Sequence, residues 1–491
     1  MAGQALLDAA KVVAALQGEQ AKLACSACSY QDVNQALVQA KAVYAKVHNE
    51  QVAVSQLPNE ILAEIFYLCQ DNWAEISSRG FGLKPFEITA SQVTKVWREI
   101  VLGTQLFWST INLAVCPQTR WRGRELQRLE TYLARSGRQS LDIFIRVIDS
   151  GSFSEFLYPL AAHSFRWRRI SFFLSAEQRL HDVHRSFHLV ESPTLEHFSV
   201  VQAPSFFRPL RRDIRVILNP ILTFGTPSLS FVRLSLTQGT MNVTPPLGDV
   251  TTLHIDFPAK DALTTEQLQN ILRMAPRLVN LSLTSLTVLP AASFVPTFTP
   301  HLRSLRIRNS PPCSTILSII TPDRLQRLTL HGMNTFTPGT VLSSLQSLTL
   351  ELCHLSDIVL EAVLRAFPDI SSLTIDGSAI GIYKMLGARH LIPPGWSGSM
   401  PPGVLLRNLK TLSIRCLHPF AIMSLGCMVY DRRFIHIPIT SMRLDAHSEE
   451  TLRAASVLSE LSAIVNLERC EQLDPWPAGL GYNEPSDGWV S

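Results

Sequence analysis

The sequence predicts an α/β protein in which a short all-α N-terminal part precedes a solenoid of repeats with a curved parallel sheet. Two observations support this division. Apolar residues between positions 5 and 102 recur at helical spacing. The residues behind them repeat the six-residue template apolar-x-x-apolar-x-apolar. A length of 491 residues, with 46% hydrophobic and 17% charged residues, is typical of a folded chain with more than one structural unit.

Residues 1–50 are predicted to form a helical segment with one interruption. Apolar residues three or four positions apart occur on both sides of the stretch ACSACSYQD: Leu6, Ala9, Val13, Leu16 and Leu23 before it, and Val33, Leu37, Ala40, Tyr44 and Val47 after it. Two short amphipathic pieces favour a helical hairpin or a weak coiled coil.

Residues 54–113 are predicted to form a small helical domain. Pro58 suits the first turn of a helix, and Glu60 lies near the positive end of its dipole. A second helix is expected at about 91–102, followed by a turn and a strand at 106–113. The first helix is apolar on more than one side: Leu57, Ile61, Leu62, Ile65, Phe66 and Leu68. These apolar residues exceed what the core of a small domain needs, which indicates a protein partner, unless they pack on the first repeat or on the N-terminal helices.

A connecting helix at 114–136 is expected to lead into a solenoid at 137–470. Clear copies of the template begin at residues 278, 302, 325, 345, 370 and 409, and weaker copies at 167, 195, 231, 250 and 439. The first five clear copies begin 20 to 25 residues apart, within the period of leucine-rich repeats. One repeat cannot bury its own apolar face, so stacked repeats form an irregular leucine-rich-repeat solenoid.

Several segments between the predicted strands have their own character. Residues 264–276 and 360–368 have helical spacing. The longest gaps between template copies contain 208–215 and 391–403, which we expect to be surface loops on the binding side. The tail at 471–491 has turn-forming residues and no period, so poor order is expected there.

The combination LPNEILAEIF, SQVTKVWREIV and LFWSTINL over residues 57–113 resembles an F-box domain, in particular that of fungal F-box proteins with C-terminal leucine-rich repeats. The resemblance implies that this domain docks on the Skp adaptor, and through it on the cullin, of a Skp–cullin–F-box ubiquitin ligase. It also implies that the repeats bind a target protein, whose identity the sequence does not give. The implied adaptor-binding residues are Leu57, Pro58, Ile61, Leu62, Ile65, Phe66, Val93, Val96 and Trp97.

No catalytic residue, cofactor or metal site is predicted, so the chain is expected not to be an enzyme. Cys25 and Cys28 have the spacing of metal ligands but no second pair nearby. His181, His184 and His188 share one helix face without a suitable carboxylate or thiol, which favours a solvated face. The stretch GWSGS at 395–399 lacks the second glycine of a nucleophile elbow and lies in a Pro-rich loop.

Charge and targeting signals limit the remaining alternatives. The formal net charge of +4, from 44 basic and 40 acidic residues, does not require a polyanionic partner. Basic runs at 119–128, 165–169 and 208–215 leave open a repeat scaffold without a ligase role that binds RNA, although solvated repeat edges are favoured. Nine widely spaced cysteines and the charged N-terminus predict an intracellular protein, cytoplasmic or nuclear, with reduced thiols and no membrane span.

Overall fold

The computed structural model describes the chain except for residues 1, 23–26, 79–84, 116–118, 148–152, 175–177, 203–220, 236–243, 257–261, 290–296, 310–312, 322–323, 337–341, 377–379, 388–402 and 471–491. The chain divides into two compact units. The first contains residues 1–110 and 131–139, and the second contains residues 111–130 and 140–490.

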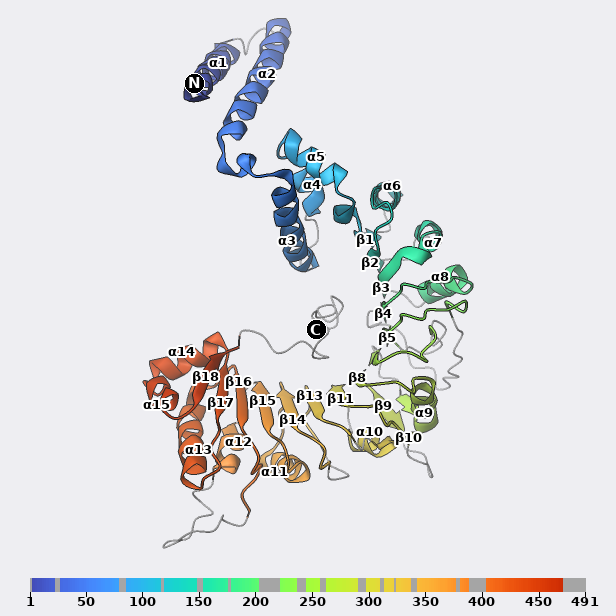
Figure 1. The fold of residues 1–491 in the computed structure, drawn as a ribbon, viewed down its shortest axis with the longest axis vertical. Coiled ribbons are helices and arrows are strands. Elements are labelled where there is room, and N and C mark those ends of the chain that lie inside the picture. The colour runs from blue at the N-terminus through green and yellow to red at the C-terminus, as the bar shows by residue number, and fades with distance from the viewer. Residues whose placement is uncertain are drawn as a thin grey trace. The chain divides into compact units, whose positions relative to one another are not determined.

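The first unit is all-helical, as the sequence predicts (Figure 1). Its helices are α1 (Ala2–Lys22), α2 (Ala27–Gln51), α3 (Asn59–Ser78), α4 (Phe86–Ala90) and α5 (Lys95–Gly103), with 3₁₀ turns η1 (Ala53–Gln56) and η2 (Gln105–Trp108). Helices α1 and α2 lie side by side with Leu37 buried, and the amide of Gln20 donates to Asn34 across the pair. The helical hairpin is therefore the alternative that the structure supports.

Local signals fix where the two helices of the predicted small domain begin. Helix α3 starts directly after Pro58, whose carbonyl oxygen accepts from the backbone amide of Leu62 at 3.0 Å. The Thr94 hydroxyl accepts from the backbone amide of Trp97 at 3.1 Å and caps α5. Helix α5 therefore begins at Lys95 and not at Ser91 as predicted, because residues 91–93 form a turn.

The second unit contains a large sheet, which has 14 strands among the described residues. Neighbouring strands from β2 to β18 pair in parallel in the order β2-β3-β4-β5-β6-β8-β11-β13-β14-β15-β16-β17-β18, and β1 borders β2. The strands are β1 (Thr110–Val115), β2 (Leu141–Val147), β3 (Trp167–Leu174), β4 (His197–Gln202), β5 (Phe231–Ser235), β6 (Thr252–Asp256), β8 (Asn280–Thr284), β11 (Ser304–Arg308), β13 (Arg327–His331), β14 (Ser347–Glu351), β15 (Ser372–Asp376), β16 (Thr411–Arg415), β17 (Ser441–Leu444) and β18 (Asn466–Arg469). Two short parallel pairs, β7 (Ala262–Thr264) with β9 (Thr287–Leu289) and β10 (Thr297–Phe298) with β12 (Ile320–Thr321), stand beside this sheet.

Every one of the eleven template copies lies on a strand of this sheet, so the predicted parallel sheet is confirmed. Equivalent template positions are paired with each other in ten of the copies. Leu305 of β11, for example, aligns with Leu281 on one side and Leu328 on the other. These leucines are almost completely buried. Alternate strand residues point to opposite faces of a sheet. The two apolar residues at the end of each copy therefore point to the same face and join continuous apolar rows in the core. The copy predicted at 231 begins two residues too late, because Phe231 pairs with His197 and Thr252, the third residues of the neighbouring copies.

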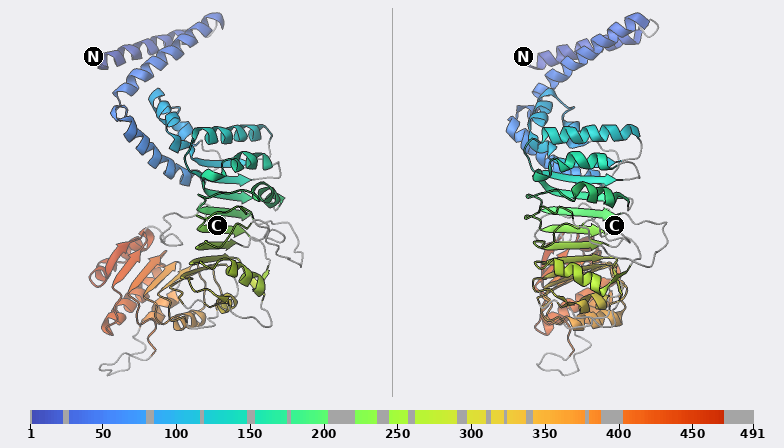
Figure 2. Two further views of the ribbon diagram at one scale, coloured as in Figure 1. Left: turned by 45° about the vertical axis from the view of Figure 1, so that its right-hand side comes forward. Right: turned by 90° about the vertical axis from the view of Figure 1, so that its right-hand side faces the viewer.

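Helices accompany the strands along one side of the sheet, as two further views show (Figure 2). The predicted helix at 264–276 is α9, which begins at Thr265 because Thr264 and Gln267 form a capping box. The predicted helix at 360–368 is α11, which begins three residues earlier because Ser356 caps it. Among the described residues these helices are α6 (Thr119–Arg135), α7 (Ser154–Ala161), α8 (Gln178–Phe187), α9 (Thr265–Met274), α10 (Cys313–Ile319), α11 (Asp357–Ala366), α12 (Ile380–Leu386), α13 (Ile422–Phe434), α14 (Ala446–Ala454) and α15 (Leu458–Ser462).

A left-handed residue follows several strands at the same repeat position. Backbone φ is between 48° and 63° at Ser285, Asn309, Gly332, Leu352 and Cys416, the residues directly after β8, β11, β13, β14 and β16. The first four donate their backbone amide to the last residue of the neighbouring strand, as Gly332 does to the carbonyl of Glu351 at 2.9 Å. The ladder is thus completed before the chain turns out of the sheet.

Three predicted features concern the limits of the units. The connecting helix predicted at 114–136 is observed as the shorter α6, since residues 114–115 belong to β1. The residues of α6 are shared between the two units. The predicted loops at 208–215 and 391–403 (except Gly403) and the tail at 471–491 lie outside the described residues. Among the residues that the structure does describe, no helix is long and apolar enough to cross a membrane.

Candidate interaction surfaces

Phe66 is at the centre of the small core that joins α3, α4 and α5. Its ring centroid lies 4.6 Å from that of Trp97, 5.9 Å from that of Phe86 and 6.4 Å from that of Phe107. Leu62, one turn before Phe66, is also buried. Positions 62 and 66 therefore form the inward stripe of α3, at the four-residue spacing of a helix face.

A buried carboxylate connects several elements of the same unit. Glu87 of α4 accepts hydrogen bonds from the Gln70 amide on α3, at 3.1 Å, and from the Tyr132 hydroxyl. The Gln70 amide also donates to the backbone carbonyl of Phe107 at 2.9 Å. Trp108 packs edge-on against Tyr132 and donates its indole N–H to the carbonyl of Val101. The core is complete and hydrogen-bonded without the outward-facing residues of α3 and α5.

The structure separates the nine residues implied as adaptor-binding into two groups. Leu62 and Phe66 lie in the core, and Trp97 is half-buried against Phe66. The other six present side chains to solvent: Leu57 (37% exposed), Pro58, Ile61 (49%), Ile65 (39%), Val93 (51%) and Val96 (49%). Ile61 and Ile65 are one turn apart on α3, so they form an outward apolar stripe beside the inward one.

Three exposed leucines of α3, α5 and η2 were not among those nine residues. Leu68 follows Ile61 and Ile65 at helical spacing and is more than half exposed, so periodicity alone could have included it. Leu102 at the end of α5 and Leu106 in η2 are also exposed. Nothing in their local sequence distinguishes these two from core leucines.

A row of charged side chains crosses the second unit at the ends of its central strands. Register places Arg308, His331, Glu351, Asp376 and Arg415 next to one another on β11, β13, β14, β15 and β16. These five residues, named the charged row here, are half-buried. They occupy the strand positions that alternate with the buried template leucines, and so lie on the opposite face of the sheet.

The charged row is partly balanced within itself. Arg415 lies 3.4 Å from the Asp376 carboxylate. Burial raises the pKa of Glu351, while the nearby Arg308 and Arg306 lower it by less. Burial also lowers the pKa of His331, as do Arg308 and Arg306. Arg308 at one end and Arg415 at the other end of the charged row thus flank an acidic centre at Glu351 and Asp376.

No family model and no curated protein matches this chain. Two surfaces of the molecule bear on its function: the apolar side of α3 and α5, and the charged row. Neither surface contains a nucleophile held by a base, and within the described residues no group of three His, Cys, Asp or Glu side chains could hold a metal ion.

The residues considered for metal or nucleic acid have other surroundings. Trp167 is completely buried and unavailable for base stacking, and Arg168 pairs with Asp142 at 2.6 Å. His184 and His188 stack on each other at 5.1 Å between centroids. The structure does not describe the side chains of Cys25, Cys28, His181 and residues 119–122, or the segments at 208–215 and 395–399.

Proposed function

We propose that the chain is an F-box substrate receptor of a Skp–cullin–F-box ubiquitin ligase, with a leucine-rich-repeat solenoid as its target-binding half. The observation that carries the proposal is the outward stripe of Ile61 and Ile65, with Leu57 and Val96, on a unit whose core is complete without them. Exposed apolar residues at such spacing favour a protein partner. The F-box-like sequence of this segment, and the parallel repeat sheet behind it, agree with a receptor.

In this function the chain supplies no reacting group. The adaptor would be held by the exposed members of the implied set, while Leu62 and Phe66 support them from the core. The charged row and its neighbours would hold the target, and ubiquitin transfer would occur on other subunits. Holding a target beside the ubiquitin carrier acts by raising its effective concentration.

The test is co-purification of the full chain with the Skp adaptor of its host. A Leu57→Asp, Ile61→Asp double variant should lose capture and keep its thermal unfolding profile, because both side chains are exposed. A matched control is Phe224→Asp, an exposed apolar residue of the second unit, which should be captured like the wild type. Leu62→Asp is unsuitable, since a buried charge would unfold the domain.

Two outcomes would count against the ligase proposal. A folded wild type that does not capture the adaptor would overturn it, and so would equal capture of the double variant. The alternative of an RNA-binding scaffold has less support, because Trp167 is buried and Arg168 is paired with Asp142. RNA affinity that falls steeply with added salt would bring that alternative forward.

A further inference from the structure

Helix α13, together with the 3₁₀ turn η5 (Pro419–Ala421) before it, presents an apolar stripe to solvent. Phe420 is 80% exposed, Met423 74%, Tyr430 48% and Phe434 66%, and Cys427 between them is also exposed. These five residues, named the α13 stripe here, are spaced alternately three and four positions apart. This is the a/d spacing with which one helix packs along another.

The stripe is not needed to hold α13 in its own unit. The opposite side of the helix is completely buried at Leu425, Met428 and Val429. Arg432 adds hydrogen bonds from its guanidinium to the backbone carbonyls of Leu405 and Leu406. The buried side of α13 is enough to anchor it. Its exposed side is also apolar, which the fold of this chain does not require.

We propose that the α13 stripe is a self-association surface, on which α13 of a second copy packs in the antiparallel direction. The stripe is symmetric in its own sequence. Phe420 and Met423 precede Cys427 by seven and four positions, and Tyr430 and Phe434 follow it by three and seven. A twofold axis near Cys427 therefore places the apolar residues of one half opposite those of the other, as an isologous interface requires. A helix from an unrelated partner would not require this symmetry.

The charged residues at the edges of the stripe are compatible with the packing of a second copy of the chain. Asp431 and Ser424 lie along one edge and Arg433 and Gly426 along the other, each pair seven positions apart. With the twofold axis near Cys427, Asp431 comes near Ser424 of the second copy, and Arg433 near its Ala421. Neither Asp431 nor Arg433 meets its own counterpart, so these two charges do not repel each other across the interface.

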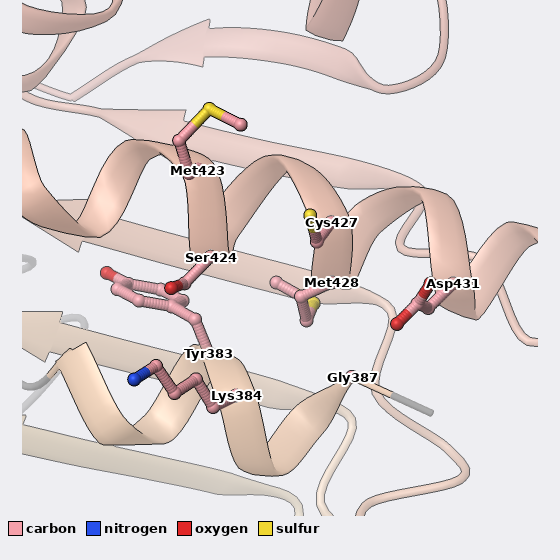
Figure 3. A pocket seen from close by; sticks show the side chains of 8 residues that line it. All are labelled: Tyr383, Lys384, Gly387, Met423, Ser424, Cys427, Met428 and Asp431. Atoms are coloured by element: carbon pink, nitrogen blue, oxygen red, sulfur yellow. The ribbon is translucent and has the colours of Figure 1, made fainter. Parts of the chain in front are cut away.

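A shallow pocket beside the stripe gives the second copy a place to insert a side chain. It has a volume of about 200 Å³ and lies between α12 and α13 (Figure 3). Met423 and Cys427 border it from α13, and Tyr383, Lys384 and Gly387 border it from α12 and its end. With the twofold axis near Cys427, Tyr430 of the second copy faces Ser424 at the border of this pocket. An aromatic ring with a hydroxyl group suits a lining that combines Met423 with the polar Lys384 and Ser424.

The size of the stripe sets the expected strength of association. An aromatic side chain can bury roughly 150–250 Å², so Phe420, Tyr430 and Phe434 together expose on the order of 300–500 Å² per chain. Two copies with Met423 and Cys427 added approach roughly 1,000 Å², the lower limit for specific interfaces. We therefore expect a reversible dimer with a Kd on the order of micromolar. This inference does not depend on the proposed ligase function.

Sedimentation equilibrium of the full chain, between about 0.5 and 200 µM to bracket a micromolar Kd, is the primary test. The wild type should move from monomer to dimer across this range. Met423→Asp and Phe434→Asp should each raise the Kd by about 100-fold or more, because each buries a charge at the interface. The matched control is Ile358→Asp on α11, which is 82% exposed and outside the stripe, and should dimerise like the wild type.

Cross-linking of the wild type tests the geometry without altering the fold. A short bifunctional thiol reagent should link Cys427 to Cys427 of the second copy, and Cys427→Ser should abolish that product. Cys69 and Cys416 are also exposed and report random collisions. A monomer at the highest concentration would overturn the proposal, as would links through Cys69 or Cys416 alone. If the stripe variants still dimerise but Val38→Asp, at an exposed residue of α2, does not, the interface lies on the N-terminal helices and the proposal is overturned.

Discussion

The ring of Trp97 on α5 packs against the ring of Phe66 on α3, with their centroids 4.6 Å apart and their planes inclined by 59°. Phe66 is buried, whereas Trp97 is half-buried and borders the solvent-facing side of α5. This contact fixes the helix that carries Val96 to the helix that carries Ile61. The apolar surface proposed for the adaptor therefore depends on a core residue that does not belong to it.

Phe66→Ala should destabilise the first unit by about 3–5 kcal/mol, since it removes a buried aromatic side chain and leaves a cavity. Ile61→Ala, on the exposed stripe of the same helix, should change stability by no more than about 0.5 kcal/mol. Urea unfolding followed by circular dichroism measures both variants. Equal destabilisation by the two substitutions would contradict the assignment of inward and outward faces on α3.

Removal of the Tyr132 hydroxyl should also destabilise the first unit. Tyr132→Phe leaves the buried Glu87 carboxylate with one donor fewer, at a cost of about 1–3 kcal/mol. Tyr158→Phe is the control, because Tyr158 is a well-exposed tyrosine of α7. Thermal melts of both variants check this, and a neutral Tyr132→Phe would mean that the remaining donors satisfy the carboxylate.

The strands were predictable because their signal is repeated. Leu281, Leu305 and Leu328 occupy the same template position and pair with one another in the sheet, so each copy supports the assignment of the next. Strand β18 at one end of the sheet, and β2 next to the terminal β1 at the other end, were not predicted. β2 lacks the first apolar residue of the template, and β18 is largely exposed and ends in Glu468 and Arg469. Repeats at or next to the end of a solenoid follow the template less closely, because a terminal repeat has only one neighbour.

The interaction surfaces were less predictable because periodicity shows faces and not what covers them. Ile61 and Leu62 are adjacent apolar residues of one helix, yet one is half exposed and the other fully buried. Which stripe turns inward depends on where α4 and η2 place Phe86 and Phe107. The α13 stripe cannot be predicted from the sequence for the same reason, since Met423 and Phe434 have the spacing of ordinary core residues. The left-handed turn after the strands has no residue signature beyond Gly332 and Asn309.

Leu352→Asn should stabilise the second unit. Leu352 has φ of 48°, a conformation that costs a leucine about 1 kcal/mol and that asparagine adopts more readily. Its side chain is half exposed, so little burial is lost. The control Leu189→Asn replaces an exposed leucine of ordinary φ and should not stabilise the protein. Melting temperatures measured side by side give the answer, and an equal or lower value for Leu352→Asn would contradict strain at this turn.

Stability of the repeat sheet should fall below about pH 6.5, in part through His331. Burial, and then Arg308 and Arg306, lower the pKa of His331 in the folded state below its ordinary value. As the pH falls, the unfolded chain takes up this proton first, so stability present above the unfolded pKa of about 6.5 is lost below it. His331→Gln should flatten this part of the profile. Melts of wild type and variant between about pH 8 and pH 5 test this, and parallel profiles would exclude His331 as the cause.

Arg432 should be indispensable to the position of α13. Its side chain is completely buried, and its guanidinium donates to the carbonyls of Leu405 at 3.1 Å and Leu406 at 2.6 Å. Burial lowers its pKa to about 10, so it stays charged at neutral pH. A lysine has one compact ammonium group and cannot reproduce this forked geometry. Arg432→Lys should therefore cost about 2 kcal/mol or more, because a buried carbonyl loses its donor.

Arg433→Lys is the matched control for Arg432→Lys, because the neighbouring guanidinium is exposed and its replacement should change stability by less than about 0.5 kcal/mol. Comparing these two variants also distinguishes the effect of Arg432 on stability from its effect on self-association. If Arg432 holds α13 so that Met423 and Phe434 project together, Arg432→Lys should weaken self-association as well as stability, whereas Arg433→Lys should alter neither strongly. Loss of stability with an unchanged dimer would show that the α13 stripe keeps its geometry without this anchor.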